Sequence, residues 1–331
     1  MLYREIGTSG MHASAVALGT WAIGGGQWWG ASDNEQSIKA IHAALDHGIT
    51  LIDTAPIYGW GRSEEVVGRA VKGRRDKVIL ATKCGIWFND LRGSTWFEME
   101  GHNVRRSVRP DTIRIEIEQS LQRLDTDYID LYQTHWQAIE PEMTPIADTM
   151  GCLLELQKEG KIRAIGVSNA TPANMDEYLA LGAMVSNQPR YSMLHRDIEA
   201  DLIPYTLAHN ISILAYSPLE QGLLTGTIGM DYQIPEGSWR NNIPWFQPHN
   251  RQRVLDLLAG WSALTDKYAC TMSQLVIAWT IQQPGITFAL CGARHPEQAE
   301  ENAGAGHVTI AADDLARMRR DIIALGDPAT A

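Results

Sequence analysis

The segment YIDLYQTH at residues 128–135 is a short apolar run that ends in polar residues. Runs of this kind, rich in Val, Ile and Leu, suit strands that are buried on both faces. The chain contains seven further short apolar runs, namely AVALGT at 15–20, TLIDTA at 50–55, VILATK at 78–83, IRAIGVSN at 162–169, MVSNQ at 184–188, ISILAYSP at 211–218 and TFALCGA at 287–293. Segments with helical periodicity lie between them, so the pattern predicts alternating strands and helices.

Helix start signals support this alternation. Ser32 with Glu35 is typical of a capping box, and Thr144 with Pro145 and Thr171 with Pro172 are each typical of an N-cap with proline at the first helical position. Eight strand–helix units without a composition break or polar linker favour a closed (β/α)8 TIM barrel over an open doubly wound sheet. We therefore expect one domain over residues 1–331, although the length alone would also allow two.

Three segments fall outside the repeat. Residues 3–14 place turn residues between two short extended pieces, which predicts an N-terminal β-hairpin that closes the N-terminal end of the barrel. Residues 85–110 and 219–250 are too long for tight connections, so we expect long loops over the C-terminal face. The first of them contains the arginines Arg92, Arg105, Arg106 and Arg109. These are either solvated surface charges or a means of attracting an anionic sugar.

Four residues with acid–base chemistry lie at or just beyond the ends of predicted strands, namely Asp53, Tyr58, Lys83 and His135. The C-terminal ends of barrel strands meet at one face, so we expect these side chains to lie together. An ammonium group beside a phenol lowers the phenol's pKa from its usual value of about 10. A carboxylate can hold that ammonium, and an imidazole can donate to a carbonyl oxygen. Taken singly, His135 is explained equally well as a core histidine, and Asp53 and Lys83 are explained equally well as a structural ion pair.

These four residues, in their order along the chain, resemble the catalytic tetrad of the aldo-keto reductases. The resemblance continues through ALGTWAIGGG at 17–26, DTAPIYGWGRSEEVVG at 53–68, ATKCG at 81–85, LDTDYIDLYQTHW at 124–136, GKIRAIGVSN at 160–169, AYSPLEQGLLTG at 215–226 and GARHPEQAEEN at 292–302. It implies a TIM barrel, a nicotinamide cofactor bound without a Rossmann domain, and reversible reduction of an aldehyde or ketone. The segments TKCG, THWQ and PLEQGLLTGTI are similar to the corresponding segments of bacterial members that act on sugars and 2-oxoaldehydes.

The resemblance also implies a role for individual residues. Tyr58 would be the general acid, Lys83 its pKa-lowering partner, Asp53 the partner of Lys83, and His135 the group that orients the carbonyl. Trp21 and Trp136 would line the substrate pocket, or else only pack. The implied cofactor contacts are Ser168, Asn169 and Gln188 at the nicotinamide carboxamide, Tyr216 under the ring, Ser217, Leu219, Gln221, Gly222 and Leu224 around the pyrophosphate, and Arg294, Gln298, Glu301 and Asn302 at the adenosine end.

The identity of the cofactor depends on one departure from the family pattern. Gln298 stands where many NADPH-dependent relatives have an arginine, which weakens the expected grip on the 2′-phosphate. Arg294 can take that role, because a guanidinium suits phosphate recognition. We expect NADPH, with NADH as the alternative.

Composition limits the other partners. A formal charge of −11 argues against binding to nucleic acid, and no run approaches the roughly 20 apolar residues of a membrane span. The cysteines form no CxxC pair and the histidines lack metal-ligand spacing, so we expect no metal. The sequence predicts a cytoplasmic enzyme that reduces a small carbonyl substrate, and it gives no indication of oligomeric state. The alternatives are a nicotinamide-sensing interaction subunit and a barrel hydrolase with two carboxylates.

Overall fold

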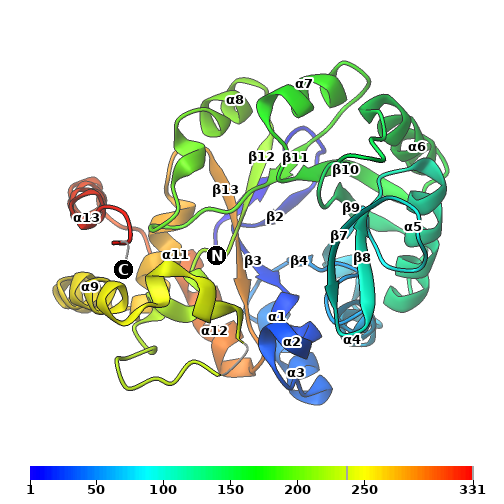
Figure 1. Ribbon diagram of the computed structural model, residues 1–331. Helices are drawn as coiled ribbons and strands as arrows, with labels where there is room; N and C mark the ends of the chain where they lie inside the picture. Colours follow the sequence, from blue (N-terminus) through cyan, green and yellow to red (C-terminus); the bar gives the residue numbers. More distant parts are fainter. Residues whose placement is uncertain (236–237, 330–331) are drawn as a thin grey trace.

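Eight parallel strands close into a barrel within residues 1–235 and 238–329, which the computed structural model describes (Figure 1). In their order around the barrel they are β10 (Ile162–Ser168), β11 (Ser186–Gln188), β12 (Ser212–Tyr216), β13 (Ile286–Gly292), β3 (Val16–Gly19), β4 (Leu51–Asp53), β5 (Ile79–Cys84) and β9 (Ile129–Thr134). Each of the predicted apolar runs forms one of these strands. The predicted (β/α)8 TIM barrel is therefore confirmed.

Helices surround the strands in Figure 1 and alternate with them along the chain. They are α1 (Trp21–Gly24), α2 (Gly26–Trp29), α3 (Asn34–Asp46), α4 (Arg62–Val71), α5 (Pro110–Leu124), α6 (Ile146–Lys158), α7 (Pro172–Leu179), α8 (Leu202–Ala208), α9 (Pro248–Ala259), α10 (Ser262–Tyr268), α11 (Met272–Ile281), α12 (Pro296–Gly304) and α13 (Ala312–Leu325). None of the helices in the described parts of the chain is both long and apolar enough to cross a membrane.

One of the three helix start signals is confirmed, and the other two place the N-cap one residue too early, since α6 has Pro145 and not Thr144 as its N-cap. Thr171 caps α7, and its hydroxyl and the Asn174 side chain form a reciprocal capping box. At α3 the N-cap is Asp33 and not Ser32, because the Asp33 carboxylate accepts from the backbone N–H groups of Glu35 and Gln36. A carboxylate at this position also interacts favourably with the helix dipole, which explains why it replaces the neighbouring hydroxyl.

The predicted N-terminal hairpin is present and consists of β1 (Tyr3–Glu5) and β2 (His12–Ser14). Ile6 and Ala13 are fully buried in the same apolar cluster as Leu131 and Phe288, which belong to barrel strands. The hairpin therefore closes the interior of the barrel at the N-terminal ends of the strands, and it leaves the opposite face for the site.

The segment 85–110 is more ordered than the expected loop. It contains an antiparallel sheet of β6 (Ile86–Trp87), β8 (His102–Arg106) and β7 (Ser94–Met99), in that spatial order. Val104 of this sheet is fully buried and clusters with Ala55 and Ile57 of the connection after β4. The segment thus forms a small sheet beside the barrel mouth, where β7 and β8 lie in Figure 1.

The second long connection, 219–250, matches the expected loop more closely. It contains the short 3-10 helices η3 (Glu220–Thr225), η4 (Trp239–Asn242) and η5 (Pro244–Phe246) before α9 begins. Residues 236–237 of this connection lie outside the described residues. Further 3-10 turns are η1 (Arg75–Lys77), η2 (Asp197–Glu199) and η6 (Ala305–His307).

Candidate active site

A fully buried lysine lies at the centre of the barrel's C-terminal face. The Lys83 ammonium, at the end of β5, donates to Asp53 Oδ1 at 2.5 Å, to the Thr54 carbonyl at 2.9 Å and to the Tyr58 hydroxyl at 3.2 Å. Asp53 is the last residue of β4, and Tyr58 belongs to the connection that follows. Asp53, Tyr58 and Lys83 therefore meet as their positions at strand ends predict.

The second oxygen of the Asp53 carboxylate is held by two amides that sequence reasoning did not assign to it. Gln133 Nε2 donates to Asp53 Oδ2 at 3.1 Å, and Gln188 Nε2 donates to the same oxygen at 2.8 Å. Gln133 could have been found from the alternation of β9, since it lies two residues after the barrel-lining Leu131 and must share its face. Gln188, expected at the cofactor carboxamide, directs its amide N–H to the ion pair, and its contact with a cofactor stays a prediction.

Two glycines allow the backbone approach that fixes the position of Tyr58. A Cβ on Gly24 would lie 2.6 Å from the carbonyl carbon of Tyr58, and one on Gly59 would lie 2.3 Å from the Gly24 oxygen. No side chain fits at such distances, so α1 rests directly on the Tyr58–Gly59 backbone. The Ser63 N–H also donates to the Tyr58 carbonyl, which ties the turn to the start of α4.

Burial decides the protonation state of the tyrosine. Burial raises the pKa of Tyr58 above its ordinary value, and the Lys83 ammonium lowers that pKa by a smaller amount. Burial also lowers the pKa of Lys83, but Asp53 and Tyr58 together outweigh it, so the lysine pKa is raised. Lys83 lowers the pKa of Tyr58, as the sequence predicts. Burial raises that pKa by more, so the net shift is upward. Near neutral pH Tyr58 therefore keeps its proton.

His135 directly follows β9 and completes the group. Its ring meets the Tyr58 ring edge-on, with centroids 5.9 Å apart and planes at 85°. Burial lowers the pKa of His135 well below 6.5, and the positive charges of Lys83 and Arg106 lower it further. The imidazole is therefore neutral near pH 7 and carries one N–H that can donate to an oxygen atom.

Aromatic side chains surround this group. Trp21 lies 6.3 Å from the Tyr58 ring and 5.7 Å from Trp28, measured between centroids. Trp136, next to His135 in the chain, lies 5.6 Å from Trp96 of β7. The two tryptophans expected at a substrate pocket are thus brought beside the tetrad, together with Trp28 and Trp96. Such walls exclude water and suit an apolar or planar substrate portion.

Three of the expected cofactor residues form one hydrogen-bonded set. Asn169 Nδ2 donates to the Ser168 hydroxyl at 3.0 Å and to the His135 carbonyl at 3.1 Å. The Tyr216 hydroxyl donates to Asn169 Oδ1 at 3.1 Å. Asn169 has a positive φ of 54°, a conformation that costs energy for a residue with a side chain and that often marks a functional site.

The connection after β12 contains a turn suited to an anion. Leu219 has φ −99° and ψ 12°, and Glu220, Gln221 and Gly222 follow with φ values of 45°, 53° and 97°. A left-handed residue after a right-handed one gathers consecutive backbone N–H groups into a concave anion site. The Glu220 side chain is buried and accepts from Arg190 and Ser192, which holds the strained turn in place. Ser217 also has a positive φ, 58°, and Leu224 is fully buried.

The residues expected at the adenosine end lie around the start of α12. Arg294 Nη1 donates to the carbonyls of Trp29 and Ala31, and Gln298 Oε1 accepts from the Arg294 backbone N–H at 2.9 Å. Asn302 Nδ2 donates to the Gly292 carbonyl, and the Glu301 carbonyl accepts from the Gln274 side chain. Gln298 thus supports Arg294 and contributes no charge of its own.

Comparison with known proteins agrees with this geometry. A family model described as the aldo/keto reductase family matches residues 15–322. The chain belongs to the aldo-keto reductase family. The family assignment made from the sequence is confirmed.

Individual relatives of this aldo-keto reductase cover nearly its whole length. It is 44% identical over 316 residues to the NADH-specific methylglyoxal reductase of Escherichia coli (strain K12), covering 95% of this chain and 96% of the relative. The glycerol dehydrogenase AKR11B4 from Gluconobacter oxydans has a solved structure with 37% identity, a TM-score of 0.87 and coverage of 99% and 97%. A Klebsiella pneumoniae aldo/keto reductase, solved in complex with NADP and acetate, has 29% identity, a TM-score of 0.71 and coverage of 96% and 94%.

The buried ion pair leads to a stability prediction. Asp53→Asn leaves the Lys83 ammonium of this aldo-keto reductase buried without a counter-charge, so we expect the free energy of unfolding to fall by about 3–5 kcal/mol. Urea denaturation measures this free energy of unfolding. The control is Glu118→Gln, which breaks a surface pair with Lys161 that should contribute at most about 1 kcal/mol. Equal losses in the two variants would contradict the importance of the buried pair.

The histidine leads to a prediction about pH. Because burial and two nearby cations lower the pKa of His135, its imidazole should show no titration midpoint at or above 6.5. NMR of histidine-labelled protein measures this, and the resonance that disappears in His135→Gln identifies the ring. A midpoint at 6.5 or higher would show that the imidazole is solvated and not enclosed by the barrel mouth.

Proposed function

We propose that this aldo-keto reductase is an NAD(P)H-dependent oxidoreductase that reduces the carbonyl of a small aldehyde to an alcohol, with Tyr58 as general acid. The observation that carries the proposal is the contact of Lys83 with both Asp53 and Tyr58, beside a neutral His135. A protonated phenol and a neutral imidazole are the two donors that a carbonyl oxygen needs as negative charge develops on it.

Each residue of the tetrad has a physical task in this proposal. Tyr58 transfers its proton to the carbonyl oxygen, and His135 donates a hydrogen bond to the same oxygen. The Lys83 ammonium, 3.2 Å from the phenol oxygen, stabilises the phenolate that Tyr58 becomes. Asp53 keeps Lys83 charged and in place. Because these donors are fixed before the substrate arrives, little reorganisation opposes the reaction.

The donor set of the site fits a nicotinamide dinucleotide. The side-chain amide and hydroxyl of Asn169 and Ser168 suit a carboxamide, Tyr216 offers a ring face, and the turn at Leu219–Gly222 offers backbone N–H groups to a pyrophosphate. When bound, the nicotinamide supplies the hydride. We propose NADPH before NADH because Arg294 can contact a 2′-phosphate, although a relative of 44% identity is named as NADH-specific.

The substrate we propose is a sugar aldehyde or a 2-oxoaldehyde. Two of the relatives are named as a methylglyoxal reductase and a glycerol dehydrogenase, and both names refer to compounds of a few carbon atoms. The packing of Trp21 against both Tyr58 and Trp28 also suits a short substrate. The reductase and dehydrogenase names give no support to the nicotinamide-sensing alternative.

The decisive test removes one hydroxyl group. Tyr58→Phe should lower kcat for aldehyde reduction by about 10²–10⁴-fold, because the proton donor is lost while the ring remains. Oxidation of NADPH and of NADH is followed separately by absorbance, with methylglyoxal and glyceraldehyde as substrates. Cofactor affinity, measured by calorimetry, should change little.

The matched control is Tyr205→Phe, which removes a hydroxyl that donates to Asp176 on the outer helices. We expect this variant to keep the activity of the unaltered protein. Full activity of Tyr58→Phe would refute the assignment of the general acid, and no turnover by the unaltered protein on any carbonyl compound would refute the proposed function.

A further inference from the structure

The guanidinium of Arg106 lies against the faces of two neighbouring tryptophan rings at the barrel mouth. Its Cζ atom is 4.1 Å from the centroid of Trp96 and 4.6 Å from that of Trp136. Arg106 is the last residue of β8, two residues after the buried Val104, so it shares the face of the strand that packs toward the site. Arg105 lies on the other face.

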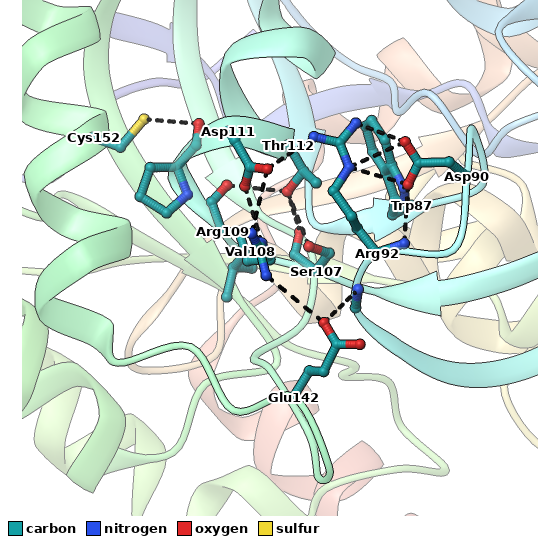
Figure 2. A network of polar contacts seen from close by, with 12 residues as sticks. Trp87, Asp90, Arg92, Ser107, Val108, Arg109, Asp111, Thr112, Glu142 and Cys152 are labelled. Atoms are coloured by element: carbon teal, nitrogen blue, oxygen red, sulfur yellow. Dashed lines mark hydrogen bonds and ion pairs between the residues drawn. The ribbon is translucent and has the colours of Figure 1, made fainter.

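The other three arginines of this segment are satisfied by groups of the protein. Figure 2 shows Arg92 bonded to Asp90 and Asp111, and Arg109 bonded to Asp111 and close to Glu142. Arg105 donates to the Gly93 carbonyl at 3.0 Å and to the Thr95 hydroxyl at 2.7 Å. These contacts tie the small sheet together and give its positive charges a structural role.

Arg106 differs from all of them. Among the residues that the structure describes, 1–235 and 238–329, no carboxylate forms an ion pair with it, and its buried Nε has no hydrogen-bond partner. The side chain is only partly exposed. A guanidinium that has lost part of its hydration and has no counter-charge is costly unless a partner is supplied. The two rings fix its orientation by cation–π contact, but they satisfy none of its N–H groups.

The position of Arg106 relates it to the chemistry. Trp136, on which it stacks, directly follows His135, and the charge of Arg106 contributes to the lowered pKa of that histidine. Lys83 is the other cation that acts on His135, and it is neutralised by Asp53. Arg106 therefore provides positive charge beside the carbonyl site that no group of the described chain compensates.

We propose that Arg106 binds a carboxylate or phosphate group of the substrate and so selects short carbonyl compounds that carry such an anion a few bonds from the carbonyl. This inference rests on the proposed function, because the tetrad fixes where the carbonyl lies. A guanidinium held in a defined plane can form two parallel hydrogen bonds to either oxyanion. The overall charge of −11 opposes large polyanions, but one local cation is sufficient for a small one.

The test compares matched substrates. One pair is glyceraldehyde 3-phosphate and glyceraldehyde, and the other is succinate semialdehyde and butanal. We expect the unaltered protein to have a higher kcat/KM for the anionic member of at least one pair, and Arg106→Gln to lower that anionic-to-neutral ratio at least about tenfold. Arg106→Lys should keep part of the preference for the anionic substrate. The pair that responds shows whether phosphate or carboxylate is preferred.

Arg105→Gln is the control, since it removes the neighbouring charge from the opposite face of β8. It should leave the ratio unchanged. The proposal is overturned if the unaltered protein prefers the neutral member of both pairs. It is also overturned if Arg106→Gln lowers both members equally, since the arginine would then only hold the two tryptophans together.

A binding measurement separates this inference from the proposed function. Quenching of tryptophan fluorescence by inorganic phosphate and by succinate requires no turnover. Saturable quenching that is lost in Arg106→Gln and kept in Arg105→Gln supports the anion site even if no aldehyde is reduced. Absence of saturable quenching by both anions, in a protein that reduces neutral aldehydes normally, would refute the site and leave the reductase function standing.

Discussion

The buried ion pair of Lys83 and Asp53 is the constraint around which the barrel is arranged. Both side chains are withdrawn from water, at 0% and 3% exposure, so their charges must be satisfied by the protein itself. The groups that do this come from different strands, with Gln133 on β9 and Gln188 on β11. Lys83 is the register partner of Gln133 across β5 and β9. A slip of one residue in either strand would turn one of them outward, so the register of the barrel and the integrity of the site depend on each other.

Much of this arrangement could be predicted from the sequence. The strands were predictable because short apolar runs that alternate with helical segments are typical of buried parallel strands, and the tetrad was predictable because its residues end those runs. The small sheet at 85–110 was missed because its two longer strands, β7 and β8, are mostly half-exposed and include Trp96 and Arg105 in place of a continuous apolar run. The direction of the Gln188 amide and the net rise of the Tyr58 pKa were beyond sequence reasoning, since both depend on burial that only the folded barrel creates.

The site therefore has two parts with different origins. Asp53, Lys83 and His135 lie at the ends of barrel strands, and Tyr58 lies in the connection after β4, on which α1 rests. The walls that face a substrate come from insertions between strands and helices, such as α1 with Trp21 and the sheet that carries Trp96 and Arg106. For the proposed reductase, changes in the sheet that carries Trp96 and Arg106 would alter which molecule fits without moving the strand ends, whereas α1 also positions Tyr58.

The N-terminal hairpin has a consequence for how the chain reaches its native state. Ile6 and Ala13 are synthesised long before Phe288, which belongs to the same apolar cluster. The interior cannot be sealed until β13 closes the circle between β12 and β3. Contacts so distant along the chain slow the search for the native topology, and apolar surface stays accessible to other chains meanwhile. The ribosome-bound chain must therefore wait with an open barrel and an undocked hairpin until β13 emerges.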